Sequence, residues 1–131
     1  MEESLAALLL AHAPLTALTA QRVHWMRAPQ NVAKPYVVMQ VISGIPDVTH
    51  GGPSGLADAR VQIDCYGLTY SSAKAVARAV TQRLSGYRGT QGATVFDGVF
   101  KAGERDEYED EASPDKLFRV SMDFLIWHKG A

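Results

Sequence analysis

The sequence predicts a two-layer α+β domain, and three stretches carry that prediction. In residues 59–66 apolar and polar side chains alternate, as in a half-buried strand. In residues 70–84 apolar side chains recur every three or four positions and mark one side of a helix, which Thr69 is placed to cap and Gly86 to end. Residues 117–127 alternate again. A strand with one apolar face followed by a helix with one apolar stripe forms half of a two-layer domain.

The N-terminal residues predict a first helix. Ser4 is placed to cap it, with Glu2 and Glu3 near its positive end. Pro14 ends it, and residues 15–21 add a short further turn of helix. The face that these residues share carries Leu5, Leu8, Leu9 and His12.

Two strands and a loop come next. Residues 23–27 form a short strand around Trp25, and the nearly continuous apolar run of residues 36–42 suits a strand covered on both faces over part of its length. The glycines and two prolines of residues 43–55 predict a flexible surface loop. A phosphate-binding loop is disfavoured there, because no P-loop lysine follows and no helix begins.

An acidic hairpin is predicted in the second half of the chain. Residues 94–101 alternate as a strand, Ala102 and Gly103 turn the chain back, and residues 104–110 form an acidic partner strand. Half of the fourteen acidic residues lie between Ala102 and Lys116, while the rest of the chain has eleven bases against seven acids. The molecule is therefore expected to carry an acidic arm on a mildly basic body.

Composition indicates a single domain over residues 1–131. The hydrophobic fraction of 47%, the charged fraction of 21% and the net charge of −1 are ordinary and point to neither nucleic acid nor membrane. The acidic start is unlike a signal peptide, so synthesis in the cytoplasm is expected. Cys65, alone of its kind and on an apolar strand face, is expected to be a small buried hydrophobe.

Two strands carry matching polar patterns. One reads Arg60, Gln62, Asp64 and the other reads Arg119, Ser121, Asp123. Antiparallel pairing in which Arg60 faces Asp123 places opposite charges side by side. Parallel pairing in matching register would place like charges opposite each other, which is destabilising. The pattern therefore predicts antiparallel neighbours in that register, and a chance match between strands that are not adjacent is the alternative.

The residues give no sign of catalysis, and no metal or cofactor is expected. The four histidines (His12, His24, His50 and His128) are scattered, without the spacing of a metal site. Ser71, Ser72 and Asp64 are close in sequence, but no histidine completes a triad pattern. The chain is therefore predicted not to be an enzyme, and an unrecognised site near His50 is the weakest of the alternatives.

The order of motifs resembles a known family. The chain opens with Glu-Ser-Leu-x-x-Leu-Leu-Leu and continues through Pro35-Tyr-Val-Val, Arg60-Val-Gln-Ile-Asp-Cys-Tyr-Gly and a helix containing Ala73-Lys74 and Ala77. It ends with Glu104-Arg-Asp-x-Tyr108 and Phe118-Arg-Val-Ser-Met-Asp-Phe-Leu-Ile-Trp127. This layout is similar to small tail components of tailed phages, prophages and gene transfer agents, in particular tail terminator and head-to-tail joining (tail completion) proteins. The resemblance covers nearly the whole chain.

The resemblance implies a fold and a role. The fold is α+β, a mainly antiparallel sheet with two helices packed on one face, to which the acidic β-hairpin arm is added. The role is a ring, usually of six subunits, that caps the tail tube and contacts the tail tube protein and the head–tail connector proteins. DNA is met only in passage, and no membrane is involved.

Two sets of residues are candidates for contacts in such a ring. A closed ring needs two unlike patches that meet, and we expect the acidic segment to reach a neighbour's basic helix. The subunit-interface candidates are Lys74, Arg78, Arg83, Glu104, Asp106, Glu107, Glu109 and Glu111. The candidates for a polar sheet face, lining either the lumen or a subunit contact, are Arg60, Gln62, Asp64, Arg119, Ser121 and Asp123. The alternative function is a nucleic-acid-binding module that uses the basic body, although the strands lack the aromatic–basic interleaving of a stacking platform.

Overall fold

The computed structural model describes the backbone of residues 1–49, 52–109 and 117–130, and the side chains of residues 1–43, 58–108 and 117–129. The helices of this part of the chain are α1 (Glu2–Leu10), α2 (Ala13–Thr19) and α3 (Tyr70–Leu84). Its strands are β1 (Val23–Trp25), β2 (Tyr36–Thr49), β3 (Gly52–Gly67), β4 (Gly89–Gln91), β5 (Thr94–Glu109) and β6 (Leu117–Gly130).

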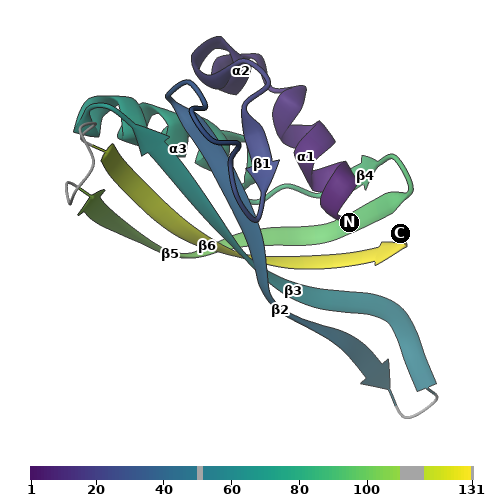
Figure 1. Ribbon diagram of the computed structural model, residues 1–131. Coiled ribbons are helices and arrows are strands. Elements are labelled where there is room, and N and C mark those ends of the chain that lie inside the picture. Colours follow the sequence, from purple (N-terminus) through teal and green to yellow (C-terminus); the bar gives the residue numbers. More distant parts are fainter. Residues whose placement is uncertain (50–51, 110–116, 131) are drawn as a thin grey trace.

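The strands form one curved sheet in the order β1-β2-β3-β6-β5-β4. β1 and β2 are parallel, and the four other neighbouring pairs are antiparallel. In Figure 1 the helices lie on one side of the sheet, and α3 packs against β3 and β6. The predicted α+β class with a mainly antiparallel sheet is therefore observed, with three helices in place of the expected two.

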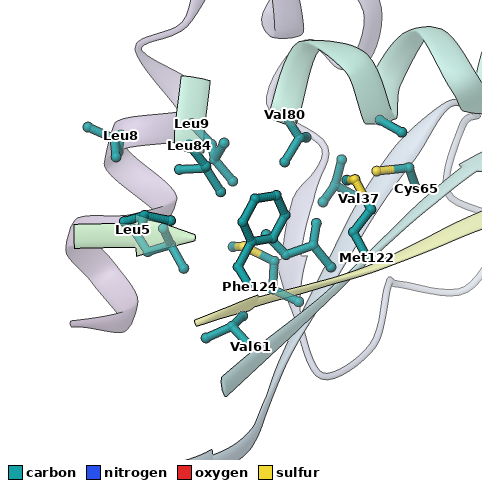
Figure 2. Packing of buried hydrophobic residues seen from close by; sticks show 14 of the residues in the cluster. Leu5, Leu8, Leu9, Val37, Val61, Cys65, Val80, Leu84, Met122 and Phe124 are labelled. Carbon is teal, nitrogen blue, oxygen red and sulfur yellow. The ribbon is translucent and has the colours of Figure 1, made fainter. Parts of the chain in front are cut away.

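The hydrophobic core lies between the helices and the sheet (Figure 2). The inward side chains of β3 and β6, among them Val61, Met122 and Phe124, are fully buried. Leu5 of α1 and Val80 of α3 belong to the same cluster. Cys65 is buried in it as expected, and burial, helped by the neighbouring Asp64 carboxylate, raises the pKa of its thiol far above the ordinary value.

The helix ends follow local rules in one helix and depart from them in another. Thr69 caps α3 as predicted, because its hydroxyl accepts a hydrogen bond from the Ser72 N–H at 3.0 Å. Gly86 lies just beyond α3 with φ of 78°, a backbone conformation that glycine adopts at low cost. The expected cap at Ser4 is wrong. α1 already begins at Glu2, with Met1 at the cap position and no side-chain cap.

The expected loop over residues 43–55 is also wrong. β2 runs on to Thr49 and β3 starts at Gly52, so most of this stretch pairs as an antiparallel hairpin. Pairing between two strands overrides the turn preference of the glycines, and Pro46 lies beside a register shift, a position where strands tolerate proline. In Figure 1 the hairpin extends well beyond the rest of the sheet.

The predicted acidic hairpin is not formed as expected. β5 is one strand from Thr94 to Glu109, and both its halves pair with β6. The expected turn at Ala102 and Gly103 is a register shift between Lys101 and Gly103, where one extra residue bulges out of the ladder. Glu104, Asp106, Glu107 and Glu109 therefore lie on the second half of β5, as part of the sheet, whereas Asp110, Glu111 and Asp115 lie outside the described residues.

Candidate functional site

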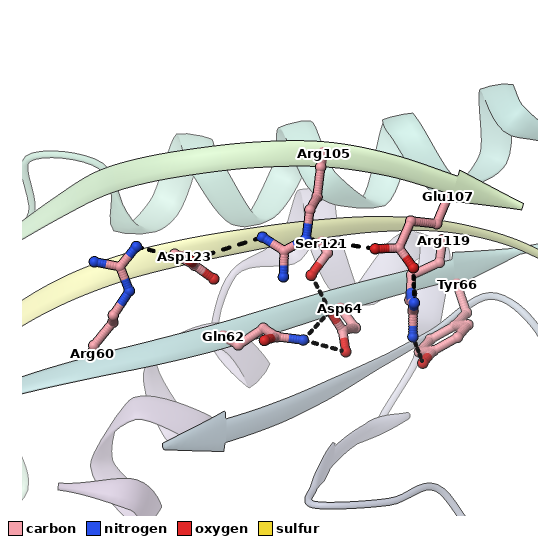
Figure 3. Close-up of polar contacts among 9 residues, drawn as sticks. All are labelled: Arg60, Gln62, Asp64, Tyr66, Arg105, Glu107, Arg119, Ser121 and Asp123. Carbon is pink, nitrogen blue, oxygen red and sulfur yellow. Dashed lines mark hydrogen bonds and ion pairs between the residues drawn. The ribbon is translucent and has the colours of Figure 1, made fainter. Parts of the chain in front are cut away.

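The sheet face opposite the helices carries a row of polar side chains from β3, β6 and β5 (Figure 3). The predicted members of this face are all present there. They are joined by Tyr66, Arg105 and Glu107, which interact with them across the strands. Arg105 was not among the predicted residues of this face, since the sequence placed it on a separate hairpin.

β3 and β6 are antiparallel neighbours as predicted, but the predicted register is wrong by two residues. Gln62 lies opposite Asp123, Asp64 opposite Ser121 and Tyr66 opposite Arg119. A shift of two residues keeps every side chain on its own face, so the apolar pattern cannot distinguish the two registers. Arg60 still reaches Asp123, diagonally, with 2.9 Å between its Nη2 and the carboxylate Oδ2.

Asp64 is the centre of this face. Its side chain accepts a hydrogen bond from the Ser121 hydroxyl at 2.6 Å and from the Gln62 amide at 3.1 Å. Asp64 is only 9% exposed and Ser121 only 1% exposed. Burial of a carboxylate costs folding free energy unless the group is hydrogen-bonded. These two donors provide the hydrogen bonds, so Asp64 has a structural role in the sheet.

A second group of contacts surrounds Arg119. Its guanidinium forms an ion pair with Glu107 of β5 and lies 5.9 Å from the centroid of the Tyr66 ring. Tyr66 is in turn stacked on Tyr36, with 4.8 Å between the ring centroids. Arg105 connects the two groups, 3.5 Å from Glu107 and 3.9 Å from Asp123. Positive and negative groups therefore alternate across this face and neutralise each other.

On the helix side, the acidic half of β5 is bound to α3 of the same chain. The Lys74 ammonium lies 2.5 Å from Glu104 and 3.0 Å from Asp106. Lys101 is 2.5 Å from Glu104, and the Tyr70 hydroxyl donates to Asp106 at 2.9 Å. These hydrogen bonds raise the pKa of Lys74, with Glu104 as the main cause, and lower the pKa of Glu104 (mainly through Lys101) and of Asp106 (mainly through Lys74).

The interface candidates thus have different surroundings. Lys74, Glu104 and Asp106 meet one another within one chain, whereas Glu107 lies on the opposite face with Arg119. The remaining candidates are Arg78, exposed on α3; Arg83, stacked 5.2 Å from the Tyr87 ring centroid; Glu109, whose side chain is outside the described part; and Glu111, which lies wholly outside it. Their role in a subunit contact stays a prediction.

The described residues form no group of three or more His, Cys, Asp or Glu side chains that could hold a metal ion. An open groove of about 650 Å³ lies between residues 26–34 and the sheet, beside Tyr36 and Tyr66. Neither a carboxylate nor a histidine is among its described lining residues, so they supply no general acid–base pair. His50 lies outside the described residues.

The structure describes the side chains of three histidines, His12, His24 and His128. Burial lowers the pKa of His128. These three are not gathered into one site with acidic partners. None of the described helices has the length and apolar character needed to span a membrane.

Comparison with known proteins identifies the family. The model of the family described as tail completion protein gp17 matches residues 3–129. A chain in a solved structure described as the virion of a native gene transfer agent particle has a TM-score of 0.82 and 20% sequence identity, covering 99% of this chain and 95% of that one. At this identity the match establishes a common fold. A search of the curated proteins finds no match. The resemblance to phage tail components is confirmed, and the chain belongs to the tail completion protein gp17 family.

Proposed function

We propose that this chain is a structural protein of the virion tail, forming a ring that closes the tail tube and joins it to the head connector. The observation that carries the proposal is the match of the tail completion family over residues 3–129. The common fold with a chain of a gene transfer agent virion supports it. Its partners are further copies of itself, the tail tube protein and the head–tail connector proteins, and it is not an enzyme.

The ring is proposed to contain six copies that meet head to tail. Such a contact joins two different surfaces of the same chain, and repetition of it closes a ring. A contact between residues 104–109 of β5 and the exposed side of a neighbour's α3 at Arg78, as the sequence predicts, is one head-to-tail contact of this kind. The chain is made in the cytoplasm of the host bacterium and resides in the tail of the particle.

The polar sheet face is proposed to line either the lumen or a subunit contact. DNA must pass the ring without being held, and each unneutralised cation facing the lumen adds salt-dependent affinity for phosphate. On this face Arg60 is paired with Asp123 and Arg119 with Glu107. A face with its cations neutralised suits passage, and the nucleic-acid-binding alternative has no support from the family or the fold match.

Deletion of the gene from a producing phage or prophage tests the proposal. We expect filled heads and separate tails that fail to join, and restoration of joined particles when the chain is supplied from a plasmid. Electron micrographs of the lysate give the counts of joined and separate structures. Normal numbers of joined particles without the chain would contradict the proposal. A mobility shift of DNA by the purified protein at moderate salt would instead favour the nucleic-acid-binding alternative.

A further inference from the structure

The sheet has two long open edges. β1 pairs with β2 only at Val37–Met39, so residues 40–49 of β2 face no further strand in the described part of the chain. At the other end β4 pairs with β5 only at residues 94–96, and the Gly86 N–H donates to the carbonyl of Val99 at 2.8 Å. Among the described residues no strand pairs with the outer side of residues 100–109 of β5, which form a second open edge with the same number of residues as the first.

The backbone hydrogen bonds between β1 and β2 also determine which backbone groups these edges present. The Val37 N–H donates to Arg22 and the Met39 carbonyl accepts from Met26, so these two residues of β2 face β1. Along an antiparallel strand, the N–H and C=O groups of successive residues point alternately to one neighbouring strand and to the other. The paired residues of β2, β3, β6 and β5 therefore determine the direction of these groups in β5. The residues of β5 whose N–H and C=O then point away from the sheet are Glu104, Asp106 and Tyr108.

The edge of β5 can accept a further strand because two of its carboxylates are bound by α3 of the same chain. Charged side chains usually protect an edge strand from pairing with another chain. Here Lys74 holds the Glu104 and Asp106 carboxylates over the helix side of the sheet, at 2.5 and 3.0 Å. Their backbone groups are left to pair. The open edge of β2 lacks one hydrogen-bond donor, because Pro46 faces this edge and offers a carbonyl but no N–H.

The β2–β3 arm, which we define as residues 45–49 and 52–57, supplies a strand that needs a partner. β6 pairs with β3 only as far as Leu56, so the outer part of the arm has no third strand among the described residues. A two-stranded hairpin alone is marginally stable in water. Since one edge belongs to β2 and the other to β5, their pairing between copies is head to tail, and such contacts build rings.

We propose that in the assembled ring the open edge of β2, including the arm, pairs with the open edge of β5 (residues 100–109) of a neighbouring copy, continuing the sheet from subunit to subunit. The partner is a second copy of this chain, and the inference rests on the proposed ring. It differs from a contact between the acidic segment and a neighbour's α3, because backbone hydrogen bonds provide the pairing and Lys74 has its partners within its own chain.

Disulfide cross-linking between copies tests this pairing. Ser43 and Arg105 are both exposed and lie on the face opposite the helices, since they pair with Arg60 and Ser121. Within one chain β3 and β6 separate β2 from β5, a spacing of roughly 14 Å that no disulfide spans. We expect Ser43→Cys combined with Arg105→Cys or Glu107→Cys to give disulfide-linked oligomers in rings isolated from purified particles. The buried Cys65 stays unreactive.

A matched control uses α3. The variant Arg78→Cys, combined with Arg105→Cys or Glu107→Cys, places the second thiol on the exposed basic helix. Cross-links with residue 78 and none with residue 43 would overturn the proposal and favour the contact with α3. Absence of cross-links from both sets in intact rings would also overturn it. Failure to find any ring in the particles would instead refute the proposed function, so the two failures are distinct.

A shortened arm gives a second, independent measurement. Ile45 and Asp58 are paired across the hairpin, so replacing residues 46–57 by Asn-Gly closes it with a two-residue turn. We expect this variant to keep the helical circular-dichroism signal of the parent chain and to unfold cooperatively. It should remain monomeric at concentrations where the parent chain assembles on tail tubes. Assembly of the folded, shortened variant into normal rings would overturn the proposed role of the arm.

Discussion

Lys74 is expected to stabilise the fold of a single chain by holding the acidic half of β5 against α3. Substitution by methionine keeps the length of the side chain and removes its charge. The side chain of Lys74 is 16% exposed and that of Glu104 is 28% exposed, and their hydrogen bond lies at the surface. The Lys74 ammonium also contacts Asp106, so its removal breaks two surface pairs. We expect Lys74→Met to lower the free energy of unfolding by about 0.5–1 kcal/mol, the upper part of the range for surface pairs. Lys101 still contacts Glu104 and limits the loss.

The effect of Lys74→Met depends on pH in a defined direction. The pKa values of Glu104 and Asp106 are lowered in the folded chain, so their contribution is present above the ordinary carboxyl pKa and is lost as the pH falls through the lowered values. The pKa of Lys74 is raised, so its contribution is present below the ordinary lysine pKa and is lost as the pH rises through the raised value. The difference between parent and variant should be largest between about pH 5 and pH 10.

Urea unfolding of four chains provides the measurement. The parent, Lys74→Met, Glu104→Gln and the double variant form a cycle whose coupling energy reports the pair itself. Arg78→Met is the matched control, since Arg78 is an exposed cation one turn further along α3, and its effect should stay within about 0.5 kcal/mol. A coupling energy of zero, or equal losses for Lys74→Met and Arg78→Met, would refute the reasoning.

Three further substitutions test other parts of the fold by urea unfolding. Ser121→Ala removes the 2.6 Å hydrogen bond to the buried Asp64 and should cost about 1.5–3 kcal/mol, whereas a loss below about 0.5 kcal/mol would mean that Asp64 is satisfied without it. Phe124→Ala, at a fully buried position, should cost about 3–5 kcal/mol, and a small loss would place this ring outside the core. Thr69→Ala should cost about 1 kcal/mol through the lost helix cap, while Ser4→Ala, which the sequence alone marks as a cap, should change stability by less than about 0.5 kcal/mol.

The parts of the fold that the sequence predicts well are those set by local patterns. The alternation around Val61 and Phe124 gives the buried face of β3 and β6, and the spacing of Val76 and Val80 gives the buried side of α3. The cap at Thr69 is equally local, since it needs only an adjacent hydroxyl. In each case a side chain acts on neighbours within a few residues, so a single stretch of sequence contains the necessary information.

The parts that the sequence predicts poorly depend on contacts between distant stretches. The glycines and prolines before Leu56 indicate a loop, yet pairing across the hairpin places Gly44, Pro46, Gly52 and Pro53 in β2 and β3. Ala102 and Gly103 indicate a turn, but β6 pairs with β5 on both sides of the bulge. The acidic residues that suggested a contact between copies include Glu104, which α3 of the same chain neutralises. Only the arrangement of the whole sheet reveals its two open edges.

The central claim, that this chain closes the tail as a ring, is tested most directly by locating it in the particle. A tag on the chain, detected with gold-labelled probe on purified tails, should mark one end of the tube and no other position. Image averaging of that end should give a closed ring with one fixed number of copies. Label spread along the tube, or tails of normal form that lack the chain altogether, would contradict the account.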